Sequence, residues 1–67
     1  MIYKVQARVL VKGETETYTT PWMGKQEAVI HFKRHKQRRN CISAIVYKLS
    51  LLGFKQVESY YAPEIRH

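Results

Sequence analysis

Apolar residues occupy every second position from Tyr3 to Val11, and polar residues such as Lys4 and Arg8 stand between the first of them. A period of two predicts a half-buried strand with one wet face. Lys12-Gly13 ends this pattern, and residues 14–20, rich in β-branched side chains, predict the second strand of a hairpin. Because that second strand is polar, we expect it at a sheet edge.

The pattern becomes helical from residue 25 to about residue 38. Glu27 suits the first turn of a helix, and the cations that follow suit its last turn. At 100° per residue, Ala28, Val29 and Phe32 share one side and should face the sheet. The cations after Phe32 point in nearly every direction around the axis. We therefore expect the last turns of this helix to extend past the sheet edge into solvent.

Two more strands are predicted after the helix. Residues 41–49 are apolar on both faces, which is typical of a central strand, and residues 50–53 predict a turn before a strand over 54–61. The order ββαββ predicts an α+β fold, an antiparallel four-stranded sheet with one helix packed across one face. We expect residues 1–61 to form a single domain and residues 62–67 a short, frayed C-terminal tail.

The net charge of +7 lies in one window, because no carboxylate occurs between Glu27 and Glu58. The densest part is the run from Lys33 to Arg39. A field of this sign attracts polyanions, chiefly nucleic acid, and also acidic protein surfaces. Seven cations occupy the window, namely Lys33, Arg34, Lys36, Arg38, Arg39, Lys48 and Lys55.

Our first functional hypothesis is a small nucleic-acid-binding domain, for DNA or RNA, that uses these seven cations. The main contacts would be to phosphates, through the basic C-terminal end of the helix, with low sequence specificity. Arginine suits bidentate contacts to phosphate, and the run contains three arginines. The structural alternative is a solvated helix end whose cations interact with the helix dipole and keep the protein soluble.

The second hypothesis is a protein-interaction module, an inhibitor or accessory factor of a larger nucleoprotein complex, of the kind that viruses or mobile elements encode. It would dock on an acidic surface. Trp22 and Met23, in a loop bounded by Pro21 and Gly24, would be its anchors, because tryptophan is common in binding hot spots. The alternative, which we favour for Trp22, is a lid folded over the start of the helix.

Aromatic residues on the predicted strands offer a third surface. Bases of single-stranded nucleic acid would stack on them if the rings reached an open sheet face beside Lys4, Arg8 and Lys48. The alternative is that they are ordinary half-buried strand residues. No glycine-aromatic signature of RNA-recognition strands is present. The aromatic residues concerned are Tyr3, Tyr18, Tyr47, Phe54, Tyr60 and Tyr61.

The sequence argues against catalysis, metal binding and membrane partners. Paired carboxylates, a phosphate-binding glycine loop and a nucleophile elbow are all lacking, so we predict neither an enzyme nor a cofactor. His31 and His35 have metal-ligand spacing but cationic neighbours, and the lone Cys41 suits a packed core position. With no apolar stretch of about 20 residues, we expect a cytoplasmic protein. Homodimerisation would add stability to so short a chain.

Overall fold

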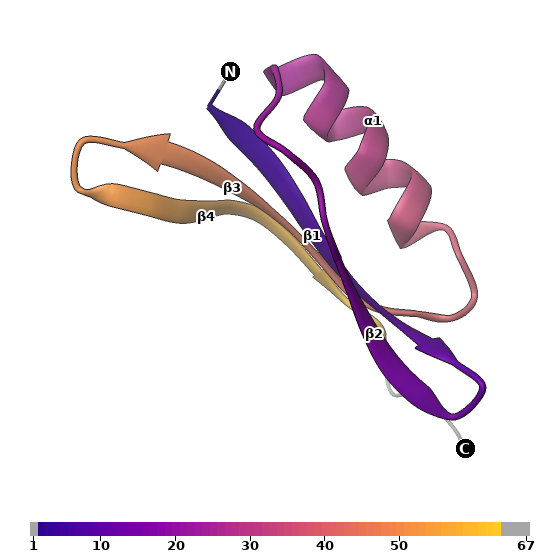
Figure 1. The fold of residues 1–67 in the computed structure, drawn as a ribbon. Coiled ribbons are helices and arrows are strands. Elements are labelled where there is room, and N and C mark those ends of the chain that lie inside the picture. Colours follow the sequence, from indigo (N-terminus) through magenta and orange to yellow (C-terminus); the bar gives the residue numbers. More distant parts are fainter. Residues whose placement is uncertain (1, 64–67) are drawn as a thin grey trace.

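The computed structural model describes residues 2–63 of the chain, as one antiparallel sheet with a helix on one of its faces (Figure 1). The strand order in the sheet is β2-β1-β3-β4, which confirms the predicted α+β fold and the ββαββ order. The elements are β1 (Tyr3–Val11), β2 (Glu14–Thr19), α1 (Lys25–Lys36), β3 (Cys41–Ser50) and β4 (Gly53–Tyr61).

The β1–β2 hairpin turns where Lys12-Gly13 predicted it. Lys12 has φ 51° and Gly13 has φ 82°, two successive left-handed residues. Such a turn matches the right-handed twist of the strands, and glycine adopts this conformation without steric cost. The strand that follows, β2, is exposed along its whole length and lies at the sheet edge, as predicted.

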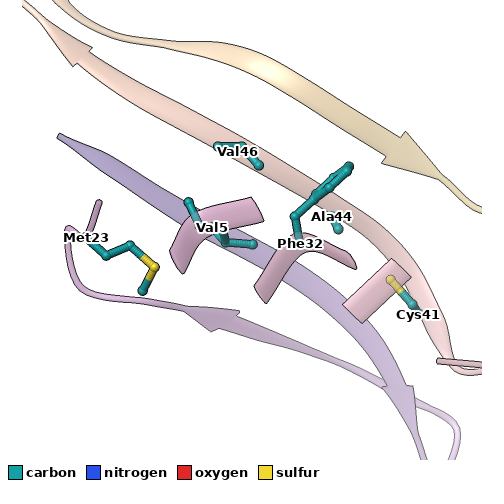
Figure 2. Packing of buried hydrophobic residues seen from close by; sticks show 7 residues of the cluster. Val5, Met23, Phe32, Cys41, Ala44 and Val46 are labelled. Carbon is teal, nitrogen blue, oxygen red and sulfur yellow. The ribbon is translucent and has the colours of Figure 1, made fainter. Parts of the chain in front are cut away.

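The core lies between α1 and the two central strands, β1 and β3 (Figure 2). Val5, Ala7 and Ala44 have no exposed surface at all, and Cys41 retains 2%. These residues define the helix side of the sheet, and the opposite surface is called the open face below. Because strand neighbours alternate between the two sides, the register assigns every strand residue to one of them.

The register breaks twice, and both breaks keep apolar residues on the helix side. Between Arg8 and Val9 the pairing shifts so that Val9 meets Cys41, and both are buried. Between Val46 and Tyr47 the shift leaves Val57 of β4 without a partner. An extra residue in one strand of a pair is a β-bulge, which bends the strand locally.

The helix begins after Gly24, whose backbone N–H donates to Glu27 Oε1 at 3.3 Å. It ends at Lys36, earlier than predicted, so Arg38 and Arg39 lie in the connection to β3. Contrary to the prediction, its last turn does not extend past the sheet edge. The ammonium of Lys36 lies 5.9 Å from the ring centre of Tyr60 on β4.

One predicted core residue is wrong. Ala28 and Phe32 are buried as expected, but Val29 is 37% exposed. The helix packs on β1 and β3, and Val29 points toward β4, which α1 does not cover. The single helix does not extend over β4, and this leaves a groove between α1 and β4.

Near the C-terminus, the Ala62 N–H donates to the Ile42 carbonyl at 2.9 Å. Of the predicted frayed tail, residues 64–67 lie outside the described part of the chain. No helix among residues 2–63 has the length and apolar character needed to cross a bilayer.

Candidate functional site

The seven predicted cations do not form one continuous patch. Arg38 and Arg39 follow α1, immediately before β3 begins at Cys41. Lys48 lies seven residues further along β3, about 23 Å away for an extended strand. Lys55 is the cross-strand partner of Lys48 and shares its position. Lys48 and Lys55 therefore extend the basic surface at the opposite end of the sheet from the two arginines.

Lysines do line a groove between α1 and the β3–β4 hairpin, which we call the lysine groove. Its floor is apolar, with Phe32 and Val46 at the core and Val57 from the bulge of β4. Its volume is about 270 Å³. The residues that line it are Tyr3, Lys25, Val29, Phe32, Lys33, Lys36, Val46, Val57 and Glu58.

Three of the groove lysines come from one side of α1. Lys25, Lys33 and Lys36 are 8 and 11 residues apart along the helix, spacings that return to one face. Lys36 Nζ lies 5.4 Å from the Phe32 ring centre, so its stem packs against the apolar floor. At the far end, Lys48 Nζ lies 5.9 Å from the ring of Tyr3. Lys25 was missed because it precedes Glu27 and so lies outside the acid-free window.

The cations of this surface lack carboxylate partners. Among the described residues, no lysine or arginine lies within 4.0 Å of a carboxylate oxygen. Glu58 is the single acidic residue lining the groove. Lys48 and Lys55 also face each other directly across β3 and β4, an arrangement that costs stability. Because these cations lack carboxylate partners in the described part of the chain, they favour the binding of an anionic ligand.

A second depression lies on the other side of α1, toward β2. It is lined by Arg38, His35 and Tyr18, together with Val9, Val11 and Asn40. The Tyr18 hydroxyl donates to Glu16 Oε1 at 2.8 Å, and this hydrogen bond raises the pKa of Tyr18. Arg38 is therefore on a different side of the helix from Lys33 and Lys36.

His35 is half-buried in this depression, and its Nδ1 atom is buried without a hydrogen-bond partner. Burial lowers the pKa of His35 below the ordinary 6.5, and the nearby charges of Arg38 and His31 lower it further. The imidazole is therefore neutral at pH 7, which limits its contribution to the positive field.

Acidification is expected to destabilise the fold through His35. The unfolded chain binds the proton more readily, so stability is full above pH 6.5 and is lost as the pH falls toward the depressed pKa of the folded state. The midpoint of thermal unfolding should fall between pH 7.5 and 5.5, and less so in His35→Phe. His31→Gln is the comparison variant, and it should reduce the pH dependence less than His35→Phe, because burial, the largest cause of the His35 shift, remains. An unchanged dependence in His35→Phe would contradict this assignment.

In the loop before α1, the adjacent residues Trp22 and Met23 point to opposite sides of the sheet. Met23 is 9% exposed and pairs with Tyr3 through backbone hydrogen bonds of 3.0 and 2.6 Å, so it belongs to the core. The hypothesis that Met23 is an exposed anchor is therefore wrong. Trp22 is half-buried and lies next to Phe54, with ring centres 6.0 Å apart. It therefore lies on the open face and not over the start of the helix.

The strand aromatics divide between the two sides of the sheet. Tyr47, Phe54 and Tyr61 are on the open face, with Lys4 and Arg8, as the register assigns them. The other aromatics, Tyr3, Tyr18 and Tyr60, are on the helix side together with Lys48. Trp22 joins the open-face group through the Tyr3–Met23 bridge, a contact between distant segments that no local pattern encodes.

Cys41 and the histidines do not gather into a metal site. Within residues 2–63, no three of the His, Cys, Asp and Glu side chains are placed to hold a metal ion. Cys41 Sγ donates to the Ser43 carbonyl at 3.4 Å, and burial raises the pKa of this thiol. A thiol with a raised pKa stays protonated and is a poor nucleophile, so Cys41 is better explained as a packing residue.

The comparisons with known proteins do not indicate a function for this chain. No protein-family model, curated protein or solved structure matches it.

Proposed function

We propose that this protein is a small nucleic-acid-binding domain of the cytoplasm, without catalytic activity, that contacts phosphates with the cations of its helix side. The observation that carries the proposal is the row formed by Lys25, Lys33 and Lys36 along one groove. Arg34 and Arg39, exposed on the helix and the following turn, and Arg38 in the second depression add further cations near the C-terminal end of α1, outside the groove. Lys48 and Lys55 lie beyond the other end of the groove, beside Tyr3.

The dimensions of the row suit a phosphate backbone. From Lys25 to Lys36 the helix rises about 16 Å, and one strand of duplex DNA carries a phosphate every 3.4 Å or so. Several phosphates therefore lie within reach of the row at once. Lysines act as point charges on flexible stems, so these contacts carry little sequence information.

The affinity for nucleic acid is expected to fall steeply with salt. Each phosphate contact on duplex DNA contributes about 0.9 to the slope of log K against log salt, so four contacts predict a slope near 3.6. Fluorescence anisotropy with labelled duplex DNA, single-stranded DNA and structured RNA between 50 and 200 mM salt measures it. No binding at 50 mM salt, or a slope below about 1, would contradict the proposal.

A second candidate function, a protein-interaction module, is favoured by the tip of the β3–β4 hairpin. Leu51 and Leu52 are fully exposed there, at 104% and 100%, and Lys48 and Lys55 flank them. Exposed apolar side chains flanked by cations suit an acidic protein surface that contains an apolar pocket. The double variant Leu51→Gln/Leu52→Gln separates the two functions, because it removes the apolar tip and leaves every cation in place.

A further inference from the structure

The open face of the sheet lies on the opposite side of the strands from the lysine groove. No element of the described chain covers it, since α1 packs on the opposite side (Figure 1). The side chains of the paired residues Gln6 and Thr19 both project from this face, where the Gln6 amide donates to the Thr19 hydroxyl at 3.3 Å. A sheet face left uncovered in so small a domain is usually polar.

This face is instead rich in aromatic groups. The ring of Phe54 meets that of Trp22 at 6.0 Å and that of Tyr47 at 5.5 Å, both edge to face. Phe54 remains 54% exposed and Tyr61 60%. Along the strands, Tyr61 follows the same side of β4 as Phe54, with Gln56 and Ser59 between them. Phe54 and Tyr61 therefore lie on the same side of β4 near its two ends, and both offer ring surface to solvent.

Among the described residues, the charged side chains on this face are all cations. Lys4 Nζ lies 4.7 Å from the Trp22 ring centre and 4.8 Å from that of Phe54, and Arg8 is exposed further along β1. The strand glutamates Glu14, Glu16 and Glu58 all pair with helix-side valines, so none of them reaches the open face. A cation between two aromatic rings, without a carboxylate, suits an anionic ligand with flat apolar groups.

We propose that the open face binds the unpaired bases of a single-stranded nucleic acid, which stack on Phe54, Tyr61 and Trp22. This inference rests on the proposed function and names its preferred ligand. Stacking accepts every base, because every base has a π-face, and Lys4 and Arg8 neutralise the adjacent phosphates. Bases inside a duplex are already stacked on one another and do not reach these rings.

The open face and the lysine groove meet at the β3–β4 hairpin. Tyr47 and Phe54 point to the open face, while their chain neighbours Lys48 and Lys55 point to the helix side. A strand that leaves the rings at this hairpin therefore reaches lysine ammonium groups directly. One single strand thereby uses both the stacking face and part of the helix-side cations.

The test compares a labelled 15-nucleotide oligothymidylate with an abasic strand of the same length and phosphate number. The thymidylate should bind at least tenfold more tightly, and it alone should quench the fluorescence of Trp22, the single tryptophan of the chain. Phe54→Ala and Tyr61→Ala should each weaken thymidylate binding about tenfold and leave abasic binding unchanged. Tyr18→Ala, at a 50% exposed tyrosine on the helix side, is the matched control.

The outcomes separate this inference from the proposed function. Equal binding of the thymidylate and the abasic strand, with salt dependence retained, overturns the stacking inference and leaves phosphate binding intact. Absence of binding to either strand at 50 mM salt overturns both. An effect of Phe54→Ala no larger than that of Tyr18→Ala, with both variants folded by circular dichroism, also overturns the inference.

Discussion

Phe32→Ala is expected to leave most of the protein unfolded at room temperature. Phe32 is 5% exposed and is the one aromatic ring within the buried cluster of α1, β1 and β3 (Figure 2). The largest fully buried side chains beside it are only Val5 and Cys41. Removing the ring costs about 3–5 kcal/mol, because the removed atoms leave a cavity that the sheet does not fill.

That loss is comparable with the whole stability of the domain. A chain of this size, with one helix and no disulfide, has about 3–5 kcal/mol available from its core. Urea unfolding followed by circular dichroism measures the difference directly. Val29→Ala is the matched control, one turn away on the same helix but 37% exposed, and should cost under about 1 kcal/mol. Equal losses for the two variants would contradict the helix orientation described above.

Val29 also shows how far the fold could be predicted from the sequence. Hydrophobic alternation located β1, the polar edge strand and the central strand, because each pattern reports the burial of its own element. A helical wheel places Val29 beside Phe32 but does not say which strand lies beneath each of them. Only the packing on β1 and β3, with β4 left uncovered, explains why one is buried and the other lines a groove.

The candidate site was less predictable for a related reason. The acid-free window is continuous along the chain, but β3 begins close to Arg38 and runs the length of the sheet, which carries Lys48 to the far end. The cations that are close together in the sequence are therefore more widely separated in the folded chain. Lys25 was missed for the opposite reason, since it joins Lys33 and Lys36 only through the geometry of the helix.

The same geometry predicts which cations matter most for binding. Lys33→Glu/Lys36→Glu should weaken duplex binding at 50 mM salt by roughly 100-fold and lower the salt slope by about two, because two phosphate contacts become repulsions. Arg38→Glu/Arg39→Glu changes the net charge equally and serves as its matched comparison. We expect a smaller loss from it, since Arg38 lies on the other side of α1 and the pair is outside the groove.

Both double variants should keep their unfolding midpoints close to that of the wild type, because all four side chains are exposed. Lys12→Glu, at the β1–β2 turn, gives the effect of a single charge reversal far from the groove. A Lys33/Lys36 variant that binds as well as Lys12→Glu would remove the groove from the phosphate contacts. If the arginine variant alone lost binding, the interface would centre on the turn after α1, and the aligned lysines would then serve solubility.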